Sequence, residues 1–367
     1  MNASPQDDRR FMLLALALGR RGLGNCWPNP AVGAVVVKDG TVVGRGWTMP
    51  GGRPHAEAEA LRRAGPLARG ATLYTTLEPC SHHGKTPPCA DAIVAAGLAR
   101  VVSAIEDPNP EVAGKGHARL REHGIAVDLG LCAAEARRAH AGHILRIREK
   151  RPQVTLKLAV SADGKVGIAG RKPVAITGGP ARNYVHLLRA MHDAILIGIG
   201  TALADDPELT CRLPGLGERS PVRVVLDKSL RLPPSGRLAQ SARIVAVRAV
   251  AGDAAGGEEA ALRALGVEIL RVPESDGKLD LHATLRALTA QGITRLLVEG
   301  GPHVAASFLR AGLVDEFVLL RAPQEIGTDG IAALAGESLE AILASGRFRS
   351  LGTDTLGVDS VETFERA

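Results

Sequence analysis

The stretch Pro54-His55-Ala56-Glu57, read together with Cys80 and Cys89, decides how the first half of this chain folds and what it holds. His55 begins a predicted helix, Cys80 follows a predicted strand, and Cys89 begins a second predicted helix just after a proline. One histidine and two cysteines supply three zinc ligands and leave the fourth tetrahedral position to water. The sequence therefore predicts an open zinc site of the catalytic type.

Glu57 stands two residues after His55 and is not one of the ligands. Zinc lowers the pKa of a bound water toward neutrality, and a nearby carboxylate can carry a proton to a ring nitrogen and a leaving amine. A His-x-Glu followed by Pro-Cys is typical of hydrolytic base deaminases. The alternative is a structural zinc site in which His82 or His83 supplies a fourth ligand.

The spacing of the two cysteines narrows the class of substrate. Eight residues separate Cys80 from Cys89, whereas nucleic-acid and free-nucleoside deaminases with this signature have two. The longer segment brings His82 and Lys85 next to the predicted metal site, where an imidazole and a cation suit a phosphate on a small substrate. The alternative for Lys85 is a solvated loop charge.

The length of 367 residues suggests two domains. Strands and helices alternate in both halves, and Lys150-Arg151-Pro152 breaks a helix predicted for residues 133–148. We therefore predict an α/β chain with a boundary near residue 149 and domains over residues 1–148 and 149–367. In the second half, the strands are expected at residues 154–160, 194–198, 222–226, 243–248, 267–271, 295–298, 314–320 and 358–364, with a surface loop over residues 249–259.

Composition excludes several classes of function. Only 2% of the residues are aromatic, which argues against a stacking platform for single-stranded nucleic acid. The net charge of +6 is dispersed, and the densest basic run, over residues 137–151, is expected to be a solvated helix face with a linker. The apolar run over residues 11–18 is too short to span a membrane, and five cysteines in a chain of this length are not a secreted disulfide framework. We expect a cytoplasmic protein.

The second half carries weaker signals. Glu299-Gly300-Gly301-Pro302 follows a predicted buried strand and precedes a helix. Such a turn is either a tight structural turn or a site where backbone N–H groups bind a phosphate. Arg189 and Arg212 are candidates for a guanidinium fork around a phosphate, although each alone is better explained as a surface charge.

The motifs of the first half, together with residues 28–33 and 107–110, resemble the bifunctional deaminase–reductase family of riboflavin biosynthesis. The resemblance implies a cytidine-deaminase-like three-layer domain that removes the 2-amino group of 2,5-diamino-6-(5-phosphoribosylamino)pyrimidin-4(3H)-one. It implies the zinc ligands His55, Cys80 and Cys89, the proton carrier Glu57, and the substrate contacts Asn29, His82, Lys85, Asp107 and Asn109. Ala34 stands where many relatives have cysteine, at a position that is not a ligand.

The second half resembles the reductase domain of the same family. The resemblance implies a dihydrofolate-reductase-like fold that uses NADPH to reduce the ribosyl group of 5-amino-6-(5-phosphoribosylamino)uracil to ribityl. The implied cofactor contacts are Ala159, Ala175, Thr201, Asp205, Lys228, Gly300, Gly301, Pro302, His303, Val304 and Ala305. The implied substrate contacts are Lys157, Pro173, Arg189, Leu209, Arg212 and Glu299.

Two segments depart from the family pattern. Many relatives carry a Ser-x-Trp-Ile-Thr segment where this chain has residues 173–177, so that only backbone contacts at Pro173 and Ala175 carry over. Lys228 follows Asp227 where serine is frequent. Lys228 and Arg231 either bind the 2′-phosphate of NADPH or belong to a solvated turn.

Two further hypotheses come from other classes: a nucleic-acid base editor with an accessory domain, and a zinc-stabilised, nucleotide-binding regulator without activity. The cysteine spacing and the scarce aromatic residues weigh against the first, and the intact Glu57 weighs against the second. The expected partners are phosphorylated pyrimidines, with no nucleic acid and no membrane, and the resemblance implies a homo-oligomer.

Overall fold

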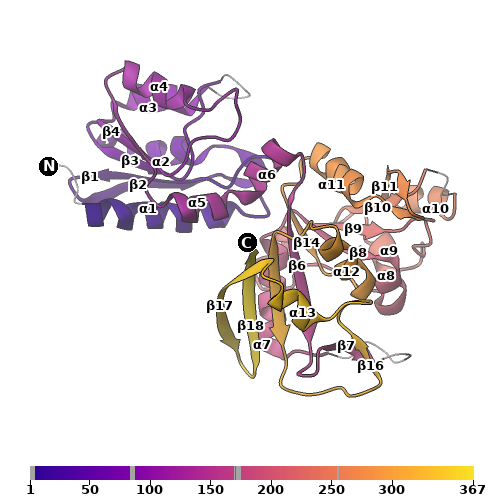
Figure 1. Cartoon of the computed structure of the whole chain (residues 1–367). Helices are drawn as coiled ribbons and strands as arrows, with labels where there is room; N and C mark the ends of the chain where they lie inside the picture. Colours follow the sequence, from indigo (N-terminus) through magenta and orange to yellow (C-terminus); the bar gives the residue numbers. More distant parts are fainter. Residues whose placement is uncertain (1–4, 83–86, 169, 171–174, 254–255) are drawn as a thin grey trace. The chain divides into compact units, whose positions relative to one another are not determined.

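The computed structural model describes residues 5–82, 87–168, 170, 175–253 and 256–367. The chain divides into two compact units, Met1–Lys150 and Arg151–Ala367, each with its own sheet (Figure 1). Among the described residues, no helix combines the length and the apolar character that crossing a membrane requires.

The first unit is built on a five-stranded sheet with the order β2-β1-β3-β4-β5. The two first strands form an antiparallel hairpin around Asp39 and Gly40, and the last three strands run parallel. The strands are β1 (Gly33–Lys38), β2 (Thr41–Trp47), β3 (Thr72–Thr75), β4 (Arg100–Ser103) and β5 (Ala126–Leu129).

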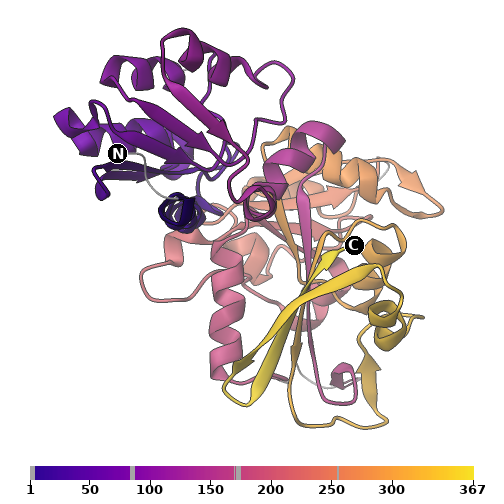
Figure 2. The same ribbon diagram turned by 60° about the vertical axis from the view of Figure 1, so that its left-hand side comes forward.

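Helices cover both faces of this sheet, which gives three layers (Figures 1 and 2). Helices α1 (Pro5–Gly19) and α5 (Ala133–Ala139) lie on one face. The other face carries α2 (Ala56–Ala64), α3 (Cys89–Ala96) and α4 (Lys115–Glu122), and α6 (Ala141–Glu149) ends the unit. The core between the layers is mainly aliphatic, as the scarcity of aromatic residues requires.

Two glycines of β2 set how closely α2 approaches the sheet. A Cβ atom on Gly44 would lie 2.2 Å from the Ala60 carbonyl oxygen, and one on Gly46 would lie 2.2 Å from that of Ala56. Any larger residue would therefore push the helix away from the sheet. Because His55 directly precedes α2, these glycines also fix the height of the candidate metal ligand above the sheet.

The second unit contains a nine-stranded sheet with the order β11-β10-β9-β8-β14-β6-β15-β18-β17. Its strands run parallel from β11 to β15, and β18 and β17 add an antiparallel end. The strands are β6 (Gln153–Val160), β8 (Ala194–Gly198), β9 (Val222–Leu226), β10 (Val247–Ala251), β11 (Glu268–Arg271), β14 (Arg295–Val298), β15 (Glu316–Arg321), β17 (Phe348–Leu356) and β18 (Asp359–Arg366).

Helices and two small strand pairs complete this unit. The helices are α7 (Gly179–Ala190), α8 (Ile199–Asp205), α9 (Arg237–Gln240), α10 (Glu259–Ala264), α11 (Leu281–Ala290), α12 (Pro302–Arg310) and α13 (Leu339–Ala344). The strand pairs are β12 (Glu274–Ser275) with β13 (Lys278–Leu279), and β7 (Lys165–Ile168) with β16 (Gly330–Ala332). Short 3-10 turns lie at Arg20–Gly22, Pro50–Gly52, Gly65–Ala68 and Gly217–Arg219.

The strand predicted over residues 243–248 and the surface loop predicted over residues 249–259 are both misplaced. The strand in the structure is β10 (Val247–Ala251), and Ala249, Val250 and Ala251 are fully buried in it. A central parallel strand is apolar on both faces and shows no alternation. A short run of alanine and valine next to glycine therefore resembles a loop when only the sequence is considered.

Two further predictions are corrected near helix ends. The helix predicted for residues 133–148 is two helices, α5 and α6, which meet at His140. Arg151, predicted to lie in a solvated linker, is buried and pairs both terminal guanidinium nitrogens with the Asp315 carboxylate at 2.6 and 2.7 Å. A guanidinium that finds a bidentate carboxylate partner can be buried.

Candidate active site

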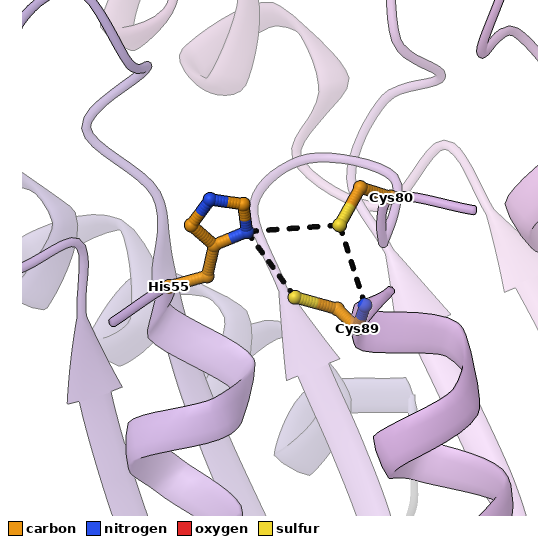
Figure 3. A group of neighbouring side chains, drawn as sticks. All are labelled: His55, Cys80 and Cys89. Atoms are coloured by element: carbon orange, nitrogen blue, oxygen red, sulfur yellow. Dashed lines mark hydrogen bonds between the residues drawn. The ribbon is translucent and has the colours of Figure 1, made fainter. Parts of the chain in front are cut away.

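Three side chains of the first unit form a compact group of metal-binding atoms. His55 precedes α2, Cys80 lies in the loop after β3, and Cys89 is the first residue of α3. His55 Nδ1 lies 3.3 Å from Cys89 Sγ and 3.6 Å from Cys80 Sγ, and the Cys89 amide donates to Cys80 Sγ at 3.3 Å (Figure 3). The fold therefore aims one nitrogen and two sulfur atoms at a common point.

The spacing of these atoms fits zinc. With Zn–S near 2.3 Å and Zn–N near 2.0–2.1 Å, tetrahedral ligand atoms are separated by roughly 3.5–3.8 Å. The distances of 3.3 and 3.6 Å from His55 Nδ1 to the two sulfur atoms are close to that range. Within the described part of the chain, which omits His83, His82 does not belong to this group. The three ligands leave one coordination position for water or substrate.

The two thiols are electrostatically unequal. The neighbouring Cys89 thiol and then His55 lower the pKa of Cys80 to about 4, against the effect of burial. The pKa of Cys89 is raised by its contact with Cys80 and by burial. The pair thus holds a thiolate at Cys80 near neutral pH, and thiolate is the form that binds metal.

Glu57 is buried next to this group, with 3% of its surface exposed. Burial raises the pKa of its carboxyl, although the nearby His55 opposes this effect. The Thr75 hydroxyl at the end of β3 donates to Glu57 Oε1 at 3.2 Å. A buried carboxyl with a raised pKa is suited to proton transfer near neutral pH.

Asn29 lies against the metal ligand. Its Nδ2 donates to the Gly52 carbonyl oxygen at 2.7 Å and lies 3.4 Å from His55 Nε2. His82 is exposed, and Lys85 lies outside the described residues. The structure therefore brings Asn29 to the site and leaves the predicted roles of His82 and Lys85 as predictions.

Asp107 and Asn109 lie together in the loop that follows β4. Asp107 Oδ1 accepts the Asn109 amide at 2.8 Å and lies 3.4 Å from His143 Nε2 of α6. Because β3 and β4 run parallel, the loop after β4 lies at the same edge of the sheet as the loop after β3, which carries Cys80. His143 was not among the residues predicted for the site.

In the second unit, Glu299 is the centre of a buried group of charges. Its carboxylate accepts Arg189 Nε at 2.8 Å and Arg189 Nη2 at 3.1 Å, and lies 3.7 Å from Lys157 Nζ. Burial favours the neutral acid, but the two cations prevail and lower the pKa of Glu299 to about 2. Burial lowers the pKa of Lys157. The structure thus joins three of the residues predicted to bind the reductase substrate.

Two more of those residues lie near this group. Arg189 Nη1 donates to the Thr210 carbonyl oxygen, next to Leu209, whose φ is +55°. A leucine in the left-handed region is strained and marks a shaped loop. Arg212 is exposed and pairs with Glu208 at 3.1 Å, whereas Arg189 pairs with Glu299. The two guanidinium groups therefore have different carboxylate partners in this structure. Pro173 lies outside the described residues.

The turn before α12 has the geometry of a backbone cradle. A Cβ atom on Gly301 would lie 2.9 Å from Thr201 Oγ1, and one on Gly300 would lie 2.6 Å from Val304. Gly301 is the N-cap of α12 and makes no side-chain capping bond. Thr201 lies in α8. A glycine turn at a helix N-terminus suits an anionic group such as a dinucleotide phosphate.

The other predicted cofactor contacts lie on several elements of the second unit. Ala159 lies near the end of β6, Asp205 ends α8 and is exposed, and Ala175 is exposed. Pro302, His303, Val304 and Ala305 form the first turn of α12. Lys228 is half-exposed and pairs with Glu274 at 2.7 Å, while its Nζ donates to the Gly277 carbonyl oxygen.

Comparison with known proteins identifies both units. Residues 5–105 match the family model of the cytidine and deoxycytidylate deaminase zinc-binding region, and residues 152–360 match that of the RibD C-terminal domain. The riboflavin biosynthesis protein RibD of Escherichia coli K12 is 44% identical over 342 residues, which cover 90% of this chain and 92% of that protein. The chain belongs to the RibD family. The RibD of Aquifex aeolicus is 40% identical and covers 98% of both chains.

Solved RibD structures have the same fold over the whole length. RibD of Acinetobacter baumannii superposes with a TM-score of 0.87 at 36% identity and covers 99% of this chain and 100% of that one. A deaminase/reductase structure from Thermotoga maritima gives a TM-score of 0.86 at 34% identity, with 99% of each chain covered. The predicted fold class is confirmed.

Membership of the RibD family establishes the activity. The chain is a bifunctional enzyme of riboflavin biosynthesis, with a deaminase and an NADPH-dependent reductase, and it acts on small pyrimidine substrates. Zinc and NADPH are its cofactors. The predictions of a deaminase, a reductase and both cofactors are confirmed.

Sequence analysis missed several side chains that support this RibD site. Thr75 contacts Glu57, Glu78 binds four backbone amides, and His143 contacts Asp107. Glu78 had one available signal, since it is an acidic residue directly before Pro79-Cys80, at the end of an apolar strand. Thr75 and His143 carry no such signal because their partners are distant in the sequence.

Proposed function

We propose that the first unit deaminates 2,5-diamino-6-(5-phosphoribosylamino)pyrimidin-4(3H)-one and that the second reduces 5-amino-6-(5-phosphoribosylamino)uracil with NADPH. The observation that carries the proposal is the convergence of His55, Cys80 and Cys89 beside the buried Glu57. The name of the Thermotoga maritima structure, a diaminohydroxyphosphoribosylaminopyrimidine deaminase/5-amino-6-(5-phosphoribosylamino)uracil reductase, supports the two substrates.

In the deaminase, His55 Nδ1, Cys80 Sγ and Cys89 Sγ hold the metal. When bound, zinc supplies a water molecule with a pKa near neutrality. Glu57 takes one proton from the water and delivers it to the ring nitrogen. It then takes the remaining proton of the added hydroxyl group and delivers it to the departing amine, which leaves as ammonia. Its burial excludes bulk water, and its raised pKa lets the same carboxyl both accept and release a proton.

Asn29, Asp107 and Asn109 bind the deaminase substrate in this proposal. Asn29 lies beside His55, and the pair of Asp107 and Asn109 lies in the loop at the same sheet edge. His82 and Lys85 are proposed to contact the phosphoribosyl arm, because they belong to the segment between the two cysteine ligands. A cationic and an imidazole group there would favour an anionic small substrate.

In the reductase, Lys157, Arg189 and Glu299 bind the sugar phosphate substrate. Two cations against one carboxylate leave this buried group with one positive charge, which suits an anionic ligand. Leu209, Arg212 and the backbone at Pro173 are proposed to complete the substrate contacts. The strained φ of Leu209 supports this role, since strain of this kind is concentrated at functional loops.

NADPH is proposed to bind at the α12 turn. Gly300, Gly301 and the first turn of α12 would hold a phosphate, with Thr201 next to Gly301. NADPH supplies the hydride when bound. The additional contacts proposed for the cofactor are Ala159, Ala175, Asp205, Lys228, Pro302, His303, Val304 and Ala305.

The division of the structure after Lys150 supports assigning deamination to residues 1–148 and reduction to residues 149–367. We propose that the partners are phosphorylated pyrimidines and a further copy of the chain, that neither nucleic acid nor a membrane is bound, and that the enzyme is cytoplasmic. The aliphatic composition and the long segment between the cysteines support the small-molecule substrate.

The test is a turnover assay on the diamino substrate, with and without NADPH, followed by mass spectrometry. Without NADPH, the product should have exchanged one amino group for oxygen. With NADPH, it should also have gained two hydrogens. Failure of the zinc-loaded chain to change the diamino compound would overturn the proposal. A tRNA substrate deaminated in its place would support the base-editor hypothesis.

Glu57→Gln is the matched variant for this assay. It should keep zinc but lose deamination by at least about a hundredfold, because it removes the proton carrier. Reduction of the already deaminated substrate should be unchanged, since Glu57 belongs to the first unit.

A further inference from the structure

We propose that Glu78 is a positioning residue for deamination, whose buried carboxylate fixes the loop of Asp107 and Asn109 relative to the metal ligand Cys80. This inference rests on the proposed function, because it assumes that the loop contacts the substrate. Glu78 itself touches neither metal nor substrate in this proposal, and it acts through the backbone of its neighbours.

The Glu78 carboxylate accepts hydrogen bonds from four backbone amides. Oε2 accepts the amides of Asp107 at 3.1 Å and Gly114 at 3.0 Å. Oε1 accepts those of Gly116 at 2.9 Å and His117 at 3.3 Å. The Glu78 side chain is completely buried. These four bonds attach both ends of the segment from Asp107 to His117 to one side chain.

The backbone at Glu78 and Pro79 also contacts the chain near both ends of the segment that the Glu78 carboxylate binds. The Glu78 amide donates to the Ile105 carbonyl oxygen at 3.0 Å, which extends the pairing of β3 and β4 past the ends of the strands. A Cβ atom on Gly116 would lie only 2.0 Å from the Pro79 carbonyl oxygen. The start of α4 therefore packs directly on the residue between Glu78 and Cys80. Movement of either loop displaces the other.

Apart from the bonds to Glu78, the side-chain hydrogen bonds of the segment from Asp107 to His117 are formed mainly within the segment itself. Asp107 Oδ1 accepts the Asn109 amide, and Asn109 Oδ1 accepts the Glu111 amide at 3.1 Å. His143 adds a contact to Asp107 from α6. These local bonds define the shape of the loop, whereas the Glu78 carboxylate connects that shape to the turn carrying Cys80.

Glu78, Glu106 and His117 also form a group in which a second metal ion is conceivable. The hydrogen bonds of Glu78 exclude it as a ligand of such an ion. A carboxylate offers about four lone-pair positions, and the four backbone amides use them. A cation would have to displace amides that have no other described acceptor nearby. The carboxylate is therefore an anchor for peptide N–H groups.

The decisive variant is Glu78→Gln, which keeps the size of the side chain. Its amide NH₂ would face two backbone N–H groups in place of an acceptor, so the loop loses one of its two attachments. We expect the KM for the diamino substrate to rise at least about tenfold, with a smaller fall in kcat. Zinc should stay near one per chain, and reduction of the deaminated substrate should be unchanged.

Two controls separate positioning from general damage. Glu59→Gln removes another buried carboxylate of the same unit, whose partners are Arg62 and Arg63 on its own helix, and should leave the deaminase KM unchanged. In an Asn109→Ala background, where one substrate contact is already absent, Glu78→Gln should have a clearly smaller effect.

Several outcomes would overturn the inference while the proposed function stands, provided that the wild-type chain deaminates the substrate. These are an unchanged KM in Glu78→Gln, loss of zinc from that variant, an equal effect of Glu59→Gln, or full additivity with Asn109→Ala. If Glu78→Gln does not yield folded protein, Glu78→Asp provides the same measurement. It keeps the charge but withdraws the carboxylate by one methylene, and the same rise in KM is expected.

Discussion

The Thr75 hydroxyl lies 3.2 Å from Glu57 Oε1 and 3.1 Å from the Leu77 carbonyl oxygen. One hydroxyl has a single proton and two lone pairs, so it cannot donate to both oxygens at once. When Glu57 is ionised, Thr75 can donate to it. When Glu57 carries a proton, Thr75 can accept that proton's hydrogen bond and donate to Leu77. The contact therefore serves the carboxyl in both protonation states.

Replacing this hydroxyl should slow deamination without removing the metal. Thr75→Val keeps the shape and leaves the buried Glu57 oxygen without its partner, which typically costs about 1–3 kcal/mol. We expect kcat for deamination to fall about tenfold and zinc content to stay at the wild-type level. Thr75→Ser restores the hydroxyl and should recover most of the rate. A Thr75→Val enzyme as fast as the wild type would show that the contact is not used.

Metal analysis of single cysteine variants tests the ligand set. Cys80→Ala and Cys89→Ala should each lower bound zinc well below one per chain, because each removes one of three ligands. Cys132→Ala and Cys211→Ala should keep it, as should Cys26→Ala, whose thiol donates to the Asn29 carbonyl oxygen. Full zinc occupancy in Cys89→Ala would contradict the assignment.

The zinc ligands and Glu57 were predictable because they occur in short motifs whose residue types have few other uses together. Glu78 and Thr75 were not predicted because their roles depend on partners brought close only by the parallel pairing of β3 and β4 and by the packing of α2. Lys228 illustrates the same limit. Its partner Glu274 lies on a two-residue strand that no periodicity in the sequence reveals.

Elements of the fold were predictable where the apolar pattern is long or bounded by clear breakers. The strands β8, β9 and β14 have the expected places. The sequence did not indicate β7, α8, α9, β16, α13 or β17, which are short or depend on tertiary packing. The break between α5 and α6 at His140 is not marked by a proline, and the nearest glycine, Gly142, lies inside the first turn of α6.

Lys228 and Glu274 offer a test of cofactor preference. If Lys228 binds the 2′-phosphate of NADPH, the phosphate competes with the Glu274 carboxylate 2.7 Å away. Lys228→Ala should raise the KM for NADPH up to about tenfold and leave NADH almost unchanged. Glu274→Gln frees the ammonium and should lower the KM for NADPH. Equal changes for both cofactors would indicate a structural pair, and no change would assign Lys228 to a solvated turn.

The stability of the first unit should fall with acid through His140. This ring is buried, and burial followed by the nearby His143 lowers its pKa to about 3, although Asp107 opposes them. The unfolded chain binds a proton at a pKa of about 6.5. The contribution of His140 to the free energy of unfolding is therefore fully present above that pH. It is lost as the pH falls from about 6.5 toward 3, by up to about 1.4 kcal/mol per pH unit.

Urea unfolding followed by tryptophan fluorescence reports this unit, because both tryptophans, Trp27 and Trp47, belong to it. Between pH 7.5 and 5, His140→Asn should lose about 2 kcal/mol less than the wild type. His192→Asn removes a comparably buried histidine of the second unit and should leave the fluorescence-detected loss unchanged. All three proteins keep the same metal ligands, so any release of zinc in acid affects them alike. If His140→Asn shows the wild-type dependence on pH, the folded chain binds a proton at His140 as readily as the unfolded chain does.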